Sequence, residues 1–209
     1  MAQAPRERLN HLLDLASRGP AGRSTLLSEL AGLLLDWPAD YGLAMRAPFE
    51  ALFEKTAREA DSATRAAIAS RLSGYEDLPV SLFNAFFLEA PRTLRERILA
   101  LNEAVDGPAE PFRADGTALL QAARTTMNGA FAGRFAALLA LREETARDIL
   151  GDRTGQSLAV ACKGAGLDQA VFSAVALLTA QAPDPGRLAH YAAVPQAGAE
   201  RLLDFWRTR

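Results

Sequence analysis

The chain has 209 residues, of which 49% are hydrophobic and 23% are charged, and its formal net charge is −2. This composition is typical of a folded globular protein and excludes a disordered or fibrous chain. The near-neutral charge also argues against strong sequence-independent binding of nucleic acid, because such binding requires several phosphates to be neutralised.

Nothing in the sequence indicates export or membrane insertion. The N-terminal residues MAQAPRERLNH lack the apolar segment of a signal peptide, and no run of about 18 apolar residues is present to span a bilayer. The single cysteine, Cys162, has no second cysteine with which to form an intramolecular disulfide. We therefore expect a cytoplasmic protein that binds neither nucleic acid nor membranes.

Helix-forming residues dominate the chain. Valine and isoleucine, which favour strands, together number only nine, whereas alanine, leucine, arginine and glutamate are abundant. No stretch alternates apolar and polar residues with the period of two that marks a strand. The composition and the patterning together predict an all-α fold.

The N-terminal part of the chain predicts a helical hairpin. Apolar residues recur at helical spacing over residues 9–16, and Gly19 and Pro20 are expected to end this first helix. A second helix is expected from Ser24, as its N-cap, to Trp37. Two antiparallel helices joined by a short turn form an αα-hairpin, the unit of helical repeats.

Four shorter helices are predicted next, beginning at Pro48, Asp61, Pro79 and Pro91. The segment after Pro79 is apolar nearly all round, which favours a place in the middle of the fold. The last of the four helices is expected to keep its arginines largely outside, and these are Arg92, Arg95 and Arg97.

Residues 106–116, DGPAEPFRADG, hold two prolines and two glycines and are the best candidate for a connection between lobes. We predict a helical lobe over 1–105 and a second over 117–209; one continuous domain is the alternative. In the second lobe, helices are expected after Asp115, after Asp168 and at Asp184–Pro185. The apolar face of the helix after Asp168 is expected to include Val171, Phe172, Val175 and Leu178.

Two glycine-containing stretches were considered as phosphate-binding loops: GPAGRST at 19–25 and GDRTGQS at 151–157. Neither has the lysine or the spacing of such a loop, and neither follows a predicted strand. We interpret both as turns between helices that carry N-caps.

Asp61, followed four positions later by Arg65 and by small apolar residues, resembles the second helix of a HEAT repeat, where this pair ties neighbouring repeats together. With the blocks at 12–35, 76–101 and 150–178, the chain is similar to a bacterial domain family of unknown function that has HEAT-like helices. The resemblance implies an irregular superhelix of αα-hairpins. Because that family has no established activity, it implies no catalytic residue and no cofactor.

Few residues suggest site chemistry. His11, His190 and Cys162 are the only residues of their types, and no two of them share helical spacing, so no metal site is predicted. Cys162 lies on a small-residue helical face, which is typical of a core thiol rather than a nucleophile.

Our leading hypothesis is a non-enzymatic interaction module that binds a protein or peptide, as grooves of helical repeats often do. The arginines at 92, 95 and 97 are its candidate partner-binding residues. One alternative is phosphotransfer with an exposed His11 as the phosphoacceptor. A second alternative is a small-ligand pocket between lobes near Trp37, Phe86 or Phe131. The C-terminal LLDFWRTR leaves a homo-oligomer open.

Overall fold

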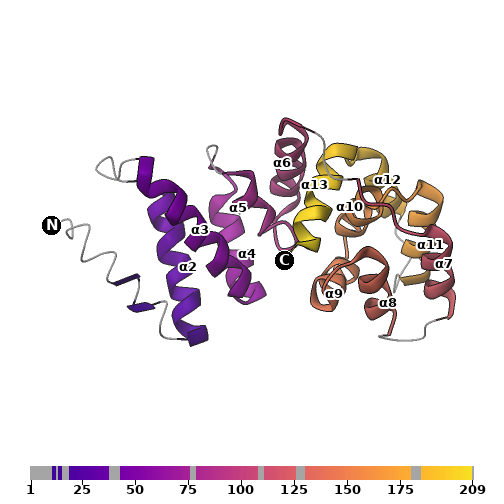
Figure 1. The fold of residues 1–209 in the computed structure, drawn as a ribbon, viewed down its shortest axis with the longest axis horizontal. Helices are drawn as coiled ribbons and strands as arrows, with labels where there is room; N and C mark the ends of the chain where they lie inside the picture. Colours follow the sequence, from indigo (N-terminus) through magenta and orange to yellow (C-terminus); the bar gives the residue numbers. More distant parts are fainter. Residues whose placement is uncertain are drawn as a thin grey trace. The chain divides into compact units, whose positions relative to one another are not determined.

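In the computed structural model, the described residues are 11–12, 14–15, 19–37, 43–75, 79–107, 111–125, 130–179 and 185–208. They form twelve helices and no strand, which confirms the predicted all-α class (Figure 1). The chain divides into two compact units, Met1–Arg95 and Glu96–Arg209. The boundary falls within helix α6 (Arg92–Glu103), upstream of the connection predicted at 106–116.

The first unit is built on leucine and phenylalanine. The leucine stripe on α2 is buried, with Leu26, Leu30, Leu33 and Leu34 each at most 2% exposed. Phe83, Phe86 and Phe87, in and after α5, are fully buried, as expected for a segment that is apolar nearly all round. The complete helices of this unit are α2 (Gly19–Leu35), α3 (Leu43–Glu59), α4 (Ser62–Leu72) and α5 (Val80–Asn84).

Two predicted helix starts in this unit are wrong. Helix α2 begins at Gly19 rather than near Ser24, so the Gly19–Pro20 pair opens a helix instead of ending one. Proline fits the first turn because the first N–H groups of a helix have no intrahelical acceptor. Helix α3 begins at Leu43 and contains Pro48, which removes one internal hydrogen bond without ending the helix.

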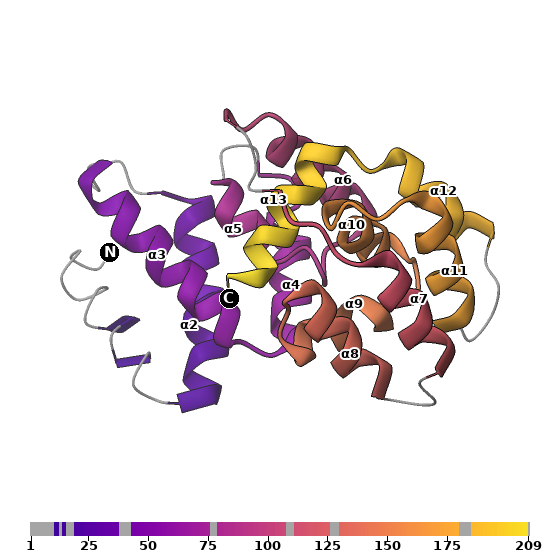
Figure 2. The same ribbon diagram turned by 45° about the vertical axis from the view of Figure 1, so that its right-hand side comes forward.

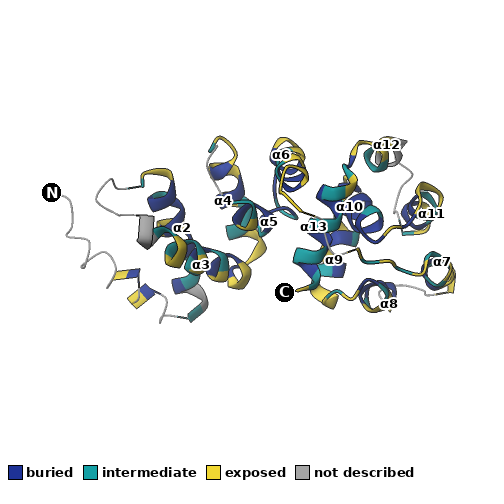
Figure 3. Cartoon of the chain, turned by 45° about the horizontal axis from the view of Figure 1, so that its top comes forward, coloured by how far each residue is buried: buried dark blue, intermediate teal, exposed yellow. Residues whose placement is uncertain are grey.

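The second unit holds seven further helices, which are α7 (Gly116–Thr125), α8 (Ala130–Leu139), α9 (Glu143–Gly151), α10 (Gln156–Gly164), α11 (Gln169–Thr179), α12 (Pro185–Ala193) and α13 (Gln196–Arg207). Helix α10 lies at its centre: nearly every residue of α10 is buried, and α13 packs closely along it (Figures 1, 2 and 3).

Glycines permit the close approach of α13 to its neighbours. A β-carbon on Gly164 of α10 would lie 2.5 Å from the carbonyl oxygen of Ala199 in α13. On α13 itself, a β-carbon on Gly198 would lie 2.6 Å from the carbonyl oxygen of Leu99 in α6. Helix α13 is therefore in backbone contact with a helix on each side, which only glycine allows at these two positions.

Aspartate caps begin several helices as the sequence predicts. Asp61 accepts a hydrogen bond from the backbone N–H of Thr64 at 2.8 Å, and Asp168 accepts one from that of Val171 at 2.8 Å. Asp115 accepts from the backbone N–H groups of Thr117 and Ala118 in α7, at 2.9 and 3.0 Å. Helix α12 begins at Pro185 as predicted, and its expected cap, Asp184, lies outside the described residues.

The two glycine-containing stretches differ in structure. GDRTGQS at 151–157 is a turn between α9 and α10, as predicted, and the Asp152 carboxylate accepts a hydrogen bond from the backbone N–H of Ser157 at 3.0 Å. GPAGRST at 19–25 lies within α2 rather than between helices.

The described parts of the predicted connection are attached to the second unit. The backbone N–H of Ala114 donates to the carbonyl oxygen of Ala165 at 3.0 Å. Arg201 of α13 donates through Nη2 to the carbonyl oxygen of Val105 at 2.7 Å. The guanidinium carbon of Arg207 lies 4.0 Å from the centroid of the Phe112 ring. These contacts hold residues 105–107 and 111–114 against the helices of their own unit.

Candidate interaction surface

Helix α11 exposes an uncharged face in the second unit. Leu177 is 60% exposed and Leu178 is 48% exposed, and no residue of α11 carries a charge. The outward residues follow the helical repeat i, i+3, i+4, i+7 and i+8, and Figure 3 shows exposed residues on this helix. We call this surface the α11 stripe, and it consists of Ala170, Ser173, Ala174, Leu177 and Leu178.

The opposite face fixes the helix in place. Phe172, Val175 and Ala176 are buried, and the Phe172 ring stacks on that of Tyr191 with a centroid distance of 5.3 Å. The Asp168 cap sets where the helix begins. Because both faces are apolar, burial of one face leaves the other uncovered in this unit.

Sequence analysis did not identify this stripe, and it placed Leu178 on the inner face, which is wrong. A signal was present: residues 169–179 contain no charged residue, and two consecutive leucines point in directions about 100° apart on a helix. The absence of charge predicts that such a helix is buried on all sides. Only the neighbouring helices determine which side is left uncovered.

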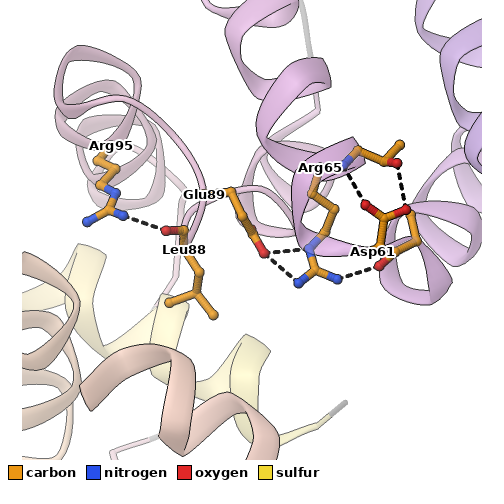
Figure 4. Close-up of polar contacts among 7 residues, drawn as sticks. Asp61, Arg65, Leu88, Glu89 and Arg95 are labelled. Carbon is orange, nitrogen blue, oxygen red and sulfur yellow. Dashed lines mark hydrogen bonds and ion pairs between the residues drawn. The ribbon is translucent and has the colours of Figure 1, made fainter. Parts of the chain in front are cut away.

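The three predicted partner-binding arginines lie in different environments. Arg92 is exposed and Arg97 is half-buried, whereas Arg95 is only 7% exposed. Arg95 donates through Nη2 to the carbonyl oxygen of Leu88, and its guanidinium carbon lies 5.5 Å from the centroid of the Phe87 ring (Figure 4). The expectation that all three lie largely outside is wrong for Arg95, which binds the turn before α6. A partner-binding role for Arg92 and Arg97 stays a prediction.

Asp61 and Arg65 connect α4 to its neighbours in the first unit. Arg65 donates through Nε to Oε1 of Glu89 at 2.6 Å and through Nη1 to the carbonyl oxygen of Ala60 at 2.7 Å (Figure 4). The Asp61 carboxylate accepts from the hydroxyl of Ser24 in α2 at 3.0 Å. These contacts connect α4 to α2 and to the turn that follows α5.

Hydrogen bonds make Asp61 an unusually strong acid. The hydroxyl and then the backbone N–H of Thr64, followed by the Ser24 hydroxyl, lower the pKa of Asp61 from 3.8 to about 2. The stabilisation from these bonds is complete above the ordinary pKa and is lost as the pH falls through about 2.

As the pH falls from 3.8 through about 2, we therefore expect the free energy of unfolding of the first unit to decrease more in the wild type than in Asp61→Asn. Urea unfolding followed by Trp37 fluorescence at several pH values measures the difference; equal losses would contradict it.

His11 lies on the surface. It is exposed within a helical segment, whereas Leu12 and Leu15 of the same segment are buried. The exposure meets the first requirement of the phosphotransfer alternative. The residues before His11 lie outside the described part of the chain.

Cys162 is a buried core thiol, as predicted. Burial in α10 raises the pKa of this thiol from 9.0 to about 12, which lowers its thiolate fraction roughly a thousandfold.

We expect a disulfide reagent such as dithionitrobenzoate to leave Cys162 of the native protein unlabelled at mildly alkaline pH and to label one thiol per chain in denaturant. Fast labelling of the native protein would show that α10 is accessible.

The aromatic residues proposed to line a ligand pocket are packed against other rings. Trp37 meets Phe49 edge-on at a centroid distance of 5.0 Å, and Phe53 lies 5.7 Å from Phe86. In the second unit, Phe131 is buried and lies 5.9 Å from Phe135. Phe86 and Phe131 belong to the core of their own units, and Trp37 is half-buried.

The described residues contain neither a metal-ligand cluster nor a membrane-spanning helix. No three side chains of His, Cys, Asp or Glu are grouped so that they could hold a metal ion. None of the described helices is both long enough and apolar enough to cross a bilayer.

Comparison with known protein families finds a match in the second unit. Residues 102–204 match the family model described as "Uncharacterised protein conserved in bacteria (DUF2336)". No curated protein and no solved structure matches the chain. The matched region contains α7 to α12 and nearly all of α13, and so includes both the α11 stripe and the buried α10. Through residues 102–204, the chain is similar to this uncharacterised bacterial family.

Proposed function

We propose that this chain is a non-enzymatic, cytoplasmic interaction module with HEAT-like helices, and that the α11 stripe binds an apolar face of a helix in a partner protein. The observation that carries the proposal is the exposure of Leu177 and Leu178 on a helix without charge. Adjacent large apolar residues on an uncharged helix face are a feature of protein-interaction sites.

The chemistry of the stripe restricts the partner. A charged partner surface would lose its hydration against these residues without gaining an ion pair, so the partner surface must be apolar. Ala170 and Ala174 lie one helical turn apart, on the N-terminal side of the two leucines. Small residues at this spacing let a second helix approach closely, with Leu177 and Leu178 packing along its side. Burial of the two leucines would contribute roughly 2–3 kcal/mol.

Site-specific crosslinking in bacterial cells tests the proposal. A photoreactive amino acid at position 177 is expected to give a discrete adduct with a partner protein, which mass spectrometry identifies. The purified partner should then bind the wild type, and Leu177→Asp should weaken this binding at least about tenfold, because it places an unpaired charge in an apolar interface.

Leu35 supplies the matched control. It is an exposed leucine, 38% accessible, on α2 of the other unit. Crosslinker at position 35 should not give the same adduct, and Leu35→Asp should bind the partner like the wild type. Adducts at both positions, or equal binding by Leu177→Asp, would reject the α11 stripe as the binding surface. An adduct between two copies of the chain would identify the interface as that of a homo-oligomer.

Phosphotransfer through His11 is a second candidate, supported by the exposure of its imidazole. Incubation with a kinase-phosphorylated receiver domain is expected to give an acid-labile phosphoryl group on the wild type and none on His11→Ala. Labelling of His11→Ala to the same extent would exclude this histidine.

A further inference from the structure

A hollow of about 340 Å³ lies between α7 and α8 in the second unit. From α7 it is lined by Ala118, Gln121, Ala122 and Thr125, which follow the helical repeat i, i+3, i+4 and i+7 and so share one face of the helix. From α8, Arg134, Ala137 and Leu138 line the same space. The volume is at the lower end of the range of small-ligand pockets.

The side chains around the hollow divide into two kinds. Three alanines and Leu138 make part of its lining apolar, and Ala122 is buried. Gln121, Thr125 and Arg134 are exposed polar groups. A ligand that fits such a site has a short apolar body and one polar end.

Arg134 sets the charge of that polar end. No described residue forms an ion pair or hydrogen bond with its guanidinium, so its donors are open to a ligand. The carboxylate of Glu143 lies beside Gly133 but pairs with Arg147. The Thr125 hydroxyl donates to the carbonyl oxygen of Gln121 at 2.8 Å, which leaves the Thr125 oxygen as an acceptor and the Gln121 amide as a further donor at the site.

We infer that the hollow between α7 and α8 binds a small organic anion, with its acidic group on Arg134 and its apolar body over the alanines. A guanidinium binds a carboxylate or a phosphate through two parallel hydrogen bonds, and the Gln121 amide can donate a third. The site is independent of the α11 stripe, because it consists of different residues on different helices.

Fluorine NMR of fluorinated probes with the full chain tests the inference. The probes are para-fluorobenzoate, para-fluorophenyl phosphate and the neutral para-fluorobenzamide, each at millimolar concentration. We expect line broadening for the anions and none for the amide. The anion with the lower Kd identifies the acidic group that the site prefers.

Variants locate the binding site. Arg134→Gln should weaken binding of the better anion roughly tenfold or more, because it removes the charge-assisted hydrogen bonds. Ala118→Leu should weaken it by filling the hollow while leaving the arginine in place. Arg142→Gln, which changes another exposed arginine of the same unit, should bind like the wild type. Binding of the amide as tightly as the anions, no broadening by either anion, or unchanged affinity in Arg134→Gln would overturn the inference.

Discussion

Gly164→Ala is expected to destabilise the second unit by roughly 3 kcal/mol, at the upper end of the usual cost of overpacking a core. The new β-carbon would lie 2.5 Å from the carbonyl oxygen of Ala199 and 2.9 Å from the β-carbon of Leu203. Urea unfolding followed by Trp206 fluorescence in a Trp37→Phe background measures the effect, because Trp206 lies on α13 and is buried.

The cost is expected to be large because α13 has no room to move away. On its other side, Gly198 meets the carbonyl oxygen of Leu99 in α6, where a β-carbon would lie 2.6 Å away. A shift of α13 that relieved the contact with α10 would press its backbone against α6. Close-packed interiors transmit such a displacement instead of absorbing it.

Gly151→Ala is the matched control within the same unit. Gly151 ends α9, and nothing lies within 4 Å of a β-carbon at that position. Alanine there should leave the stability unchanged or raise it by about 0.5 kcal/mol, because the unfolded chain loses some freedom. A loss of less than about 1 kcal/mol in Gly164→Ala would contradict the close approach of α10 and α13.

The start of a helix could be predicted from the sequence where a single side chain determines it. Asp61, Asp115 and Asp168 accept hydrogen bonds from N–H groups two or three residues ahead, so the information is local. Proline and glycine were less informative. Gly19–Pro20 and Pro48 each fit more than one position near a helix terminus, so both predicted starts were wrong.

The candidate interaction surface could not be predicted because it depends on the neighbours of a helix. Periodicity identifies an apolar face, but α11 is apolar on both faces, and only the packed unit shows which one is covered. Arg95 fails for a related reason. Its place among charged residues indicated exposure, yet its side chain reaches the carbonyl oxygen of Leu88, seven residues earlier, through a turn that the sequence does not specify.

Glu89→Gln is expected to destabilise the first unit by about 3 kcal/mol, because it leaves a largely buried arginine side chain without its counter-charge. The side chains of Arg65 and Glu89 are 16% and 8% exposed, and the carboxylate accepts from both Nε and Nη2 of the arginine. The remaining bond from Arg65 to the carbonyl oxygen of Ala60 keeps the loss at the lower end of the range for broken buried pairs. Urea unfolding followed by Trp37 fluorescence in a Trp206→Phe background measures it.

An exposed pair in the same unit provides the comparison. Arg23 and Glu59 are 3.2 Å apart, with side chains 37% and 42% exposed. Glu59→Gln should cost less than about 1 kcal/mol, because water screens both charges. Added salt should reduce that small loss but leave the effect of Glu89→Gln nearly unchanged, since screening acts mainly on exposed charges.

The double variant Arg65→Met/Glu89→Met separates the pairing of the two charges from the space that they fill. If Glu89→Gln acts by leaving the Arg65 charge unpaired, replacing both partners with apolar side chains of similar length should reduce the stability less than Glu89→Gln alone. A double variant that is less stable than either single variant would mean that the ion pair itself contributes net stability. In that case the Arg65–Glu89 pair would act as an attractive link between α4 and the turn after α5, and not only as a requirement that each buried charge be matched.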